Sequence, residues 1–452
     1  TNNMKYLKLA VLLFLGTTTF AQTTIIRQDV DIKNMINEVS AKNVENTVRK
    51  LVSFGTRHTM SDTLSKTTGI GAARNWIKAE FEKYSAASGG RLKVEFDTFI
   101  QPADGRRILK DATLKNVLAI LPGTDPTDNR VFVVSGHYDS RASNANDATS
   151  KAPGAVDDAS GTAVTMELAR VMSTQKYNAT IIFVAAVGEE QGLYGAAHLA
   201  KRAKQEGWNV VAMITNDIVG NTYGGETDLK DNTSVRVFSE GVPVTETKQE
   251  GNTRIAVGGE NDSPAREFAR YVKEVAERYV SQLNVKLIYR RDRYLRGGDH
   301  TAFSQEGFAA VRFTEMNENF DRQHQDVRVE KGVDYGDMPD FADYNYIQKV
   351  CRMNLAVLAN IAKAPAEPVN VGIVTSDLTN NTTLRWEAPK STKPAGYYIL
   401  MRETTSPFWE KKIYVTDTKV TLPYSKDNFF FAVQSVDDTG HESAIIFPKP
   451  VR

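Results

Sequence analysis

The chain has 452 residues, of which 41% are hydrophobic and 25% are charged, and its formal net charge is +1. This length exceeds what one compact core usually holds, so we expect two or three domains. The near-neutral charge offers no electrostatic surface for nucleic acid, which we therefore exclude as a partner.

The first 21 residues have the features of a secretory signal peptide. Lys5 and Lys8 precede a short apolar run at 9–15, and small residues up to Ala21 follow it. A charged start, an apolar core and a small-residue exit are typical of such signals, and the run is too short to span a bilayer. We therefore expect residues 1–21 to be removed. The mature protein is then secreted, periplasmic or associated with the cell surface, without a stable membrane span.

Residues 29–363 alternate between helical and strand patterns. Apolar residues recur at helical spacing in six segments: 29–54, 69–84, 162–173, 196–206, 263–283 and 344–362. Short apolar or alternating runs indicate seven strands: 92–96, 115–121, 131–134, 179–187, 210–217, 286–289 and 309–313. The polar, glycine-rich segment 220–262 is expected to form a long loop or a small excursion. This alternation predicts an α/β fold with a doubly wound, mostly parallel sheet flanked by helices.

The C-terminal residues 364–452 have a different texture. A proline-containing linker at 365–368 precedes short alternating strands at 383–386, 397–402 and 429–437. This pattern predicts a small all-β sandwich. The position of Trp386, the tyrosine-bearing strand and the Ala-Val-Gln-Ser-Val-Asp ending resemble a fibronectin type III domain. We expect a separate module, without catalytic residues, that binds a surface or a protein partner.

The stretch 131–161 places a histidine and an aspartate at neighbouring element boundaries. His137 follows the apolar run 131–134, and Asp157 precedes the helical pattern at 162–173. Ligands of open α/β sheets bind at this edge, and an imidazole with a carboxylate suits Zn²⁺. Asp139 lies on the same side of an extended chain as His137 and could bond the other ring nitrogen. The alternative is an ordinary strand end followed by an aspartate helix cap.

Further residues of the metal-ligand type lie beside other predicted strands: Glu189, Glu190, Asp217 and His300. Taken singly, each is a cap or a solvated turn residue. Together at one edge, the acidic side chains repel each other unless a cation compensates them. The set offers oxygen and nitrogen ligands and no thiolate, which suits zinc or a related divalent ion. It is large enough to hold two ions and to leave one carboxylate for proton transfer.

Five motifs, in this order, resemble those of the co-catalytic di-zinc aminopeptidases, of which bacterial leucyl aminopeptidases are typical. They are His-x-Asp-Ser, Ala-Pro-Gly-Ala-x-Asp-Asp-Ala-Ser-Gly, Gly-Glu-Glu-x-Gly-Leu-x-Gly-Ala, a strand ending in Asp, and Gly-Asp-His. The resemblance covers about residues 43–363. One departure is that the single cysteine, Cys351, cannot form the disulfide found near the substrate pocket of some secreted relatives.

The resemblance implies a zinc exopeptidase fold with two Zn²⁺ per chain. It implies five metal ligands, with Asp157 bridging the ions: His137, Asp157, Glu190, Asp217 and His300. It also implies that Glu189 is the general base, that Asp139 is the partner of His137, and that the peptide bond between Asp157 and Asp158 is cis.

The function implied is that of an aminopeptidase acting on peptides with a free N-terminus. Glu189 would take a proton from a water activated by the metal and pass it to the leaving amine. A carboxypeptidase or dipeptidase on the same fold is the main alternative, because a cluster of arginines precedes His300: Arg290, Arg291, Arg293 and Arg296. An aminoacyl cyclase with one zinc, or a non-catalytic binding protein on the same fold, is disfavoured because the ligand set and Glu189 are complete.

Overall fold

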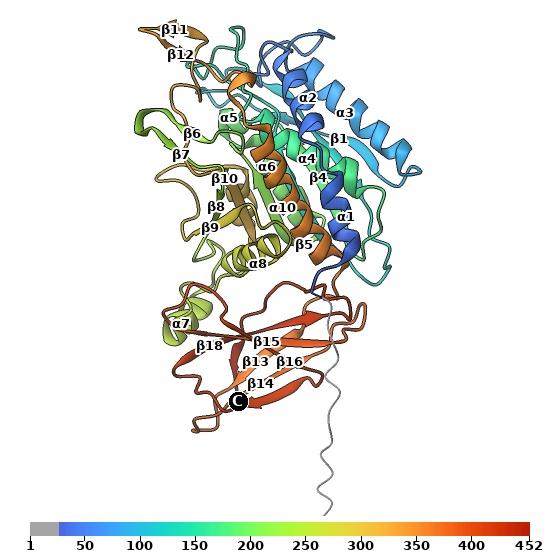
Figure 1. The fold of residues 1–452 in the computed structure, drawn as a ribbon, viewed down its shortest axis with the longest axis vertical. Coiled ribbons are helices and arrows are strands. Elements are labelled where there is room, and N and C mark those ends of the chain that lie inside the picture. Colours follow the sequence, from blue (N-terminus) through green and yellow to red (C-terminus); the bar gives the residue numbers. More distant parts are fainter. Residues whose placement is uncertain (1–26) are drawn as a thin grey trace, which may run out of the picture.

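The computed structural model describes residues 27–452 (Figure 1). The predicted signal peptide, residues 1–21, lies outside the described residues. Among the helices of the described part, none combines the length and the apolar character that crossing a membrane requires.

The core of the larger domain is an eight-stranded mixed sheet in the order β1-β2-β4-β3-β5-β10-β8-β9. Its strands are β1 (Lys93–Gln101), β2 (Ala112–Leu121), β3 (Arg130–His137), β4 (Thr180–Ala186), β5 (Asn209–Asn216), β8 (Ser234–Ser239), β9 (Asn284–Ile288) and β10 (Ala310–Glu315). The four central strands, β4, β3, β5 and β10, run parallel to one another. Antiparallel pairings occur where β1 and β2 join one side and β8 joins the other. The predicted α/β class with a mostly parallel sheet is confirmed.

Helices cover both faces of this sheet. One face packs against α1 (Val30–Glu38), α2 (Ala41–Val52), α3 (Gly69–Ala87), α4 (Ala159–Met172), α8 (Pro264–Tyr279) and α10 (Tyr344–Lys363). The other packs against α6 (Tyr194–Gln205) and α9 (Asp299–Gln305). Strand β3 serves both cores, because Phe132 and Val134 face the first and Val133 faces the second. This alternation within a continuous apolar run is the mark of a strand buried on both faces.

The segment 220–262 is more ordered than the sequence predicted. It holds β6 (Tyr223–Gly224), η1 (Gly225–Thr227), β7 (Leu229–Lys230), β8 and α7 (Lys248–Val257). Strand β8 belongs to the main sheet, and its side chains Val235, Val237 and Phe238 are buried. The signal was a short alternation of valine and polar residues at 234–237, which the surrounding polar sequence obscured.

Between β10 and α10, the chain forms a long excursion at the top of the view in Figure 1. It contains the hairpin of β11 (Arg328–Glu330) and β12 (Val333–Tyr335) and the short helix η2 (Pro339–Phe341). No element was predicted for this segment, which carries part of the candidate site.

The C-terminal unit consists of two sheets, ordered β17-β14-β13-β19 and β16-β15-β18. Its strands are β13 (Val369–Val374), β14 (Thr382–Glu387), β15 (Gly396–Glu403), β16 (Lys411–Val415), β17 (Lys419–Leu422), β18 (Phe429–Val436) and β19 (Lys449–Val451). Side chains of both sheets, including Leu384, Trp386 and Phe431, form a core between them. The three predicted strands are all present as β14, β15 and β18. The resemblance to fibronectin type III stays a prediction.

This unit packs directly below the larger domain in Figure 1. Three of its apolar side chains, Leu400, Ala432 and Ile445, belong to the same buried cluster as the helices of the larger domain. The unit therefore shares part of its core with its neighbour, which argues against the expectation that it is freely separable.

Candidate metal centre

The predicted site residues lie where the parallel strands end. His137 is the last residue of β3, Asp217 follows β5, and Glu189 and Glu190 open the short helix α5 (Glu189–Gly192) after β4. The register pairs His137 with Ala186 at the end of β4 and Ser135 with Thr215 near the end of β5. Because these strands are parallel, their carboxyl ends meet at one edge of the sheet.

Two glycines allow the start of α4 to approach this edge. A side chain on Gly136 would lie 2.2 Å from the backbone of Gly161, and one on Gly161 would lie 1.9 Å from the carbonyl oxygen of Asn216. Only glycine permits such close packing of a helix on strand ends. The approach brings Asp157 and Asp158 to the site, and the peptide bond between them is cis, as the resemblance implied.

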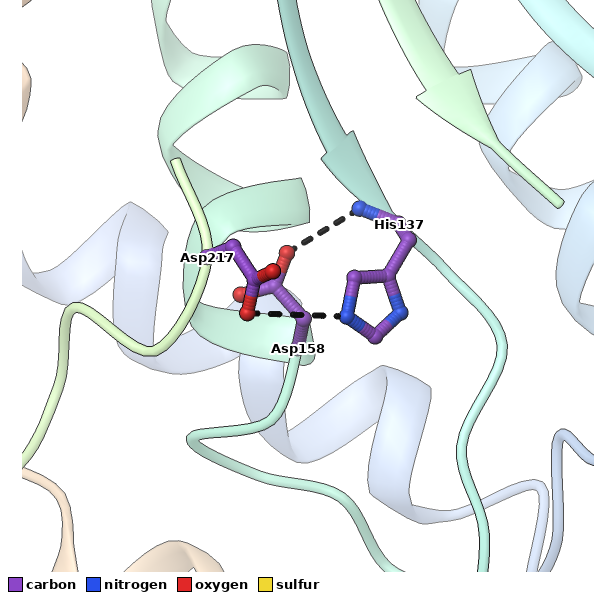
Figure 2. Close-up of side chains that lie close together, drawn as sticks. All are labelled: His137, Asp158 and Asp217. Atoms are coloured by element: carbon purple, nitrogen blue, oxygen red, sulfur yellow. Dashed lines mark hydrogen bonds and ion pairs between the residues drawn. The ribbon is translucent and has the colours of Figure 1, made fainter. Parts of the chain in front are cut away.

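Asp158 lies beside His137 and Asp217 and organises the strand ends (Figure 2). Its carboxylate accepts backbone N–H bonds from His137 at 3.0 Å, Gly161 at 2.9 Å and Ile218 at 3.2 Å. These bonds join the end of β3, the first turn of α4 and the chain after β5. Although Asp158 lies close to His137 and Asp217, its oxygens are already committed to the backbone.

His137 presents a buried ring nitrogen to a group of carboxylates. Its Nε2 lies 3.2 Å from Oδ1 of Asp157, 3.7 Å from Oδ1 of Asp217 and 3.9 Å from Oε2 of Glu189. This nitrogen has no hydrogen-bond partner among the described residues. On its other side, Nδ1 lies 3.2 Å from the carbonyl oxygen and 3.5 Å from the carboxylate of Asp139. The ring is thus held from behind while its front nitrogen points at acceptors that a cation would link.

A second group forms on the other oxygen of Asp157. Nε2 of His324 lies 2.9 Å from Oδ2 of Asp157 and 2.9 Å from Oε1 of Glu190. Gln323 donates a hydrogen bond to the same Asp157 oxygen at 3.0 Å. Asp157 therefore turns one carboxylate oxygen toward each of two histidines, His137 and His324.

The structure does not bring His300, the predicted fifth ligand, into this cluster. His300 is buried in the first turn of α9, where its Nε2 lies 2.6 Å from the carbonyl oxygen of Arg291 and 3.5 Å from Asp292. Burial lowers the pKa of His300 to about 4, so this ring is neutral and serves as a donor to the carbonyl. The place beside Asp157 and Glu190 belongs to His324, a residue that the sequence analysis did not consider.

The adjacent glutamates have different partners. The carboxylate of Asp139 accepts the backbone N–H of Glu189 at 3.3 Å and that of Glu190 at 3.1 Å, which fixes the first turn of α5. The Glu190 side chain contacts His324, whereas the Glu189 carboxylate accepts no hydrogen bond from the described residues and lines the cavity. The two neighbours are therefore suited to different tasks.

Other residues hold the loop that carries Asp157. The buried guanidinium of Arg57 donates to the carbonyl oxygens of Tyr138, Pro153 and Gly154 at 2.6–2.8 Å. Asp337 accepts the backbone N–H of Asp157 at 2.7 Å. Sequence reasoning missed both residues, because backbone-binding side chains far apart in sequence leave no local motif.

Negative charge dominates this edge of the sheet. Arg312 lies 3.0 Å from Asp217 and compensates that carboxylate. Burial, followed by the charges of Asp217 and Glu190, raises the pKa of Glu189 well above its usual range. Burial alone would lower the pKa of His324, but Glu190 and Asp157 raise it to about 10.

The raised pKa of Glu189 marks an acidic group that lacks sufficient counter-charge. The unpartnered nitrogen of His137 and the oxygen-rich, thiolate-free donor set therefore fit divalent cations of the zinc type.

Comparisons with known proteins agree with this architecture. A sequence model described as peptidase family M28 matches residues 116–343, which is 228 of 452 residues and includes both histidine groups. A probable zinc metalloprotease of Leptosphaeria maculans is 47% identical over 421 residues, covering 93% of this chain and 97% of the relative. One from Pyrenophora teres f. teres is 46% identical and covers 93% of this chain and 87% of the relative. The unmatched 7% is smaller than the C-terminal unit, so the similarity extends into that unit.

Among solved structures, the LapA aminopeptidase of Legionella pneumophila has a TM-score of 0.53 at 19% identity and covers 76% of this chain and 77% of its own. An aminopeptidase from Aneurinibacillus sp. strain AM-1 has a TM-score of 0.51 at 15% identity, covering 73% and 96%. At these identities the likeness concerns the fold alone. With the family match over half of the sequence and relatives above 45% identity along most of it, the chain belongs to peptidase family M28.

Proposed function

We propose that this protein is a zinc metallopeptidase that removes residues from the N-terminus of peptides. The observation that carries the proposal is the position of Asp157, whose two oxygens face two separate groups of ligands. A carboxylate shared in this way is what a pair of adjacent metal ions requires. The curated relatives reported above are themselves described as probable zinc metalloproteases.

In this proposal, each ion has a histidine, a second carboxylate and a share of Asp157. His137 and Asp217 hold one ion, and Glu190 and His324 hold the other. His324 replaces His300 of the sequence prediction. When bound, the two zinc ions would polarise the scissile carbonyl and lower the pKa of a water molecule in the site.

Glu189 is the residue left for proton transfer. Its carboxylate lines the cavity beside the proposed ligands and is free of hydrogen bonds to described residues. It takes the proton of the attacking water and delivers it to the nitrogen of the leaving amine. Asp139 positions both the His137 ring and the backbone of Glu189, so it is a positioning residue.

The acidic floor of the cavity supports cleavage at the N-terminus. Glu189 lines it beside the proposed metal ligands, and its carboxylate, which the ions leave free, can accept a hydrogen bond from the α-ammonium group of a substrate, so that a free N-terminus is favoured. The fold neighbours described as aminopeptidases are consistent with this preference. A carboxypeptidase or dipeptidase is the second candidate, because arginines also line the cavity.

A substrate panel on protein of measured zinc content tests the proposal. Leucyl-alanyl-amide, acetyl-leucyl-alanine and leucyl-alanine separate the need for a free amine from the need for a free carboxylate. We expect cleavage of leucyl-alanyl-amide and no cleavage of acetyl-leucyl-alanine. This activity should be lost when the metal is chelated and should return when zinc is added. Cleavage of the acetylated peptide alone would assign a carboxypeptidase, and no cleavage by fully zinc-loaded protein would refute the peptidase assignment.

We further propose that the protein is exported and that its C-terminal unit contacts a surface or a protein partner. The support is the signal-like sequence at 1–21. Expression of the full gene, followed by N-terminal sequencing of the protein outside the cell, tests export. Retention of the intact N-terminus inside the cell would contradict it.

A further inference from the structure

The cavity over the proposed metal ligands has a volume of about 320 Å³ and an unusual lining. Four arginines surround it, and we call them the arginine rim: Arg107, Arg141, Arg293 and Arg296. They come from three separate loops, between β1 and β2, between β3 and α4, and between β9 and α9. Arg290 and Arg291, which the sequence analysis grouped with them, do not line the cavity. Three unrelated loops therefore supply the same charge to one opening.

Charges of opposite sign lie at different depths in this cavity. The acidic lining residues Asp157, Glu190 and Asp217 are buried, with exposed fractions of 2–5%. Arg107 and Arg141 are half-buried, and the side chain of Arg296 is 36% exposed. The carboxylates thus form the floor, where the proposed ions would neutralise them, and most of the arginine charge lies above them.

The arginine rim retains charge that its neighbours do not cancel. Arg293 and Arg296 both contact Glu318, at 3.2 and 2.8 Å, and Arg293 also pairs with Asp292 at 3.0 Å, so the charge of these two arginines is largely compensated. Arg107 donates to the backbone carbonyl of Glu190, and Arg141 donates to two backbone carbonyls of its own loop at 2.9–3.1 Å. Within the described residues, neither Arg107 nor Arg141 forms an ion pair. Both guanidinium groups therefore remain available to an anionic ligand.

The same lining offers little to an apolar side chain. Leu193 and Ile218 are the only two of its thirteen residues with apolar side chains. A pocket that selects an aliphatic residue is instead lined mainly by hydrophobic and aromatic groups.

We propose, on the basis of the proposed peptidase function, that this site selects peptides that present a carboxylate to the arginine rim. Arginine binds carboxylates through paired N–H donors, and partial burial strengthens such bonds. The carboxylate is either the side chain of an acidic residue flanking the scissile bond or the C-terminal carboxylate of a short peptide. Arg107 and Arg141 are the specificity-determining residues, because neither has a carboxylate partner in the described part of the chain.

Matched substrate pairs test the proposal and identify the source of the carboxylate. The pairs are Glu-Ala-amide with Gln-Ala-amide, Leu-Glu-amide with Leu-Gln-amide, and Leu-Ala with Leu-Ala-amide. In at least one pair, the carboxylate member should have a kcat/KM about 10- to 100-fold higher, the range for a hydrogen bond to a charged group. This ratio should fall as salt is raised, since exposed charges are screened.

Substitution of the rim distinguishes specific recognition from general attraction. Arg107→Gln and Arg141→Gln should each lower the carboxylate-to-amide ratio by about tenfold, as expected for one charged hydrogen bond. Arg106→Gln is the matched control, because Arg106 is exposed, adjacent to Arg107 and outside the cavity lining. It should leave the ratio unchanged. An equal fall in all three variants would overturn the assignment.

The outcomes separate this proposal from the function on which it rests. If Leu-Ala-amide is cleaved and every pair has a ratio near one, the arginine rim does not select carboxylates, and the peptidase function stands. If no peptide is cleaved, the peptidase function fails, and calorimetric binding of the same uncleaved pairs to zinc-loaded protein decides the question. Tighter binding of the carboxylate member of a pair would show that the arginine rim selects carboxylates. Equal affinities within every pair would refute that selection.

Discussion

Two clusters of buried charge in this structure differ in how their carboxylates are balanced. At the carboxyl edge of the parallel strands, Asp157, Glu189 and Glu190 face histidine rings and one another, with few cations among them. At the contact between α8 and the C-terminal unit, Asp262 has two arginine partners, Arg402 at 2.6 Å and Arg270 at 3.1 Å. Both clusters are shielded from water, but the carboxylate of the second has permanently charged arginine partners, whereas Asp157 and Glu190 at the sheet edge contact a histidine ring, whose charge depends on its protonation.

The second cluster continues across the same interface. Glu267 pairs with Arg270 and accepts the indole N–H of Trp409 at 2.8 Å. Glu442 of the C-terminal unit contacts Arg278 at 2.8 Å and Lys412 at 3.0 Å. A buried carboxylate with its own cation holds two elements together, whereas one without a cation calls for an exogenous ion. The comparison teaches that charge balance, not burial, distinguishes the site from the interface.

The largest expected effect comes from Glu189→Gln. Loss of a positioned general base lowers turnover by about 10²- to 10⁴-fold, and the metal content should stay at two ions per chain. Glu190→Gln is the matched variant at the next position and should lose metal instead, because it removes a contact of His324. Metal analysis and turnover on both variants provide the test. Metal loss in Glu189→Gln with retention in Glu190→Gln would reverse the two roles.

The next largest effect shows which of two histidines, His324 or His300, is a metal ligand, a question that the sequence alone did not answer. His324→Ala should lower the affinity for one of the two zinc ions. Removing a residue that only orients a ligand lowers metal affinity by roughly 10- to 100-fold, and the loss in His324→Ala should be larger. His300→Ala should leave the stoichiometry at two, since the ring binds the carbonyl of Arg291. Zinc titration in a metal buffer measures both. Normal affinity in His324→Ala would remove it from the ligand set.

Substitutions in the cluster around Asp262, at the contact with the C-terminal unit, should lower the free energy of unfolding and leave the zinc content unchanged. Arg402→Met leaves Asp262 with one arginine fewer in a buried site, and breaking such a pair destabilises by about 3–5 kcal/mol. Arg385→Met, on the exposed side of β14, is the control and should change stability by less than about 0.5 kcal/mol. Denaturant unfolding together with zinc analysis checks the pair. A loss of zinc from folded Arg402→Met protein would show that the two clusters are coupled.

The smallest effect is a pH dependence at the interface. Burial would raise the pKa of Glu442, but Lys412 and Arg278 lower it to about 2, below its ordinary value of 4.5. A lowered pKa in the folded state stabilises the protein above the unfolded pKa, and this contribution is lost as the pH falls toward the folded pKa. In chelator-treated protein, the difference in melting temperature between wild type and Glu442→Gln should be constant above about pH 5 and shrink below it. A constant difference down to pH 3 would contradict the assignment.

Much of the fold was accessible from the sequence because it rests on local periodicity. Fully apolar runs marked β3, β4 and β5, and the helical spacing marked α8 and α10. Four predicted ligands, His137, Asp157, Glu190 and Asp217, lie together because each sits at the end of a strand or the start of a helix. Strand β8 escaped detection because it is short and its flanking sequence is polar.

His324 could not be identified in the same way. It lies nine residues beyond the end of β10 in a polar loop, and its approach to Asp157 depends on how that loop folds over the sheet edge. His300 stood in a more suggestive Gly-Asp-His motif but precedes β10 along the chain. The rule that ligands follow the carboxyl ends of parallel strands, applied to β10, favours the loop that contains His324.

Anomalous diffraction at the zinc edge, from crystals of the zinc-loaded protein, tests the central claim most directly. Two peaks about 3.5–4 Å apart should flank Asp157, one within about 2.0–2.2 Å of Nε2 of His137 and the other equally close to Nε2 of His324. A single peak, or a second peak coordinated by His300 with His324 outside coordinating distance, would contradict the account.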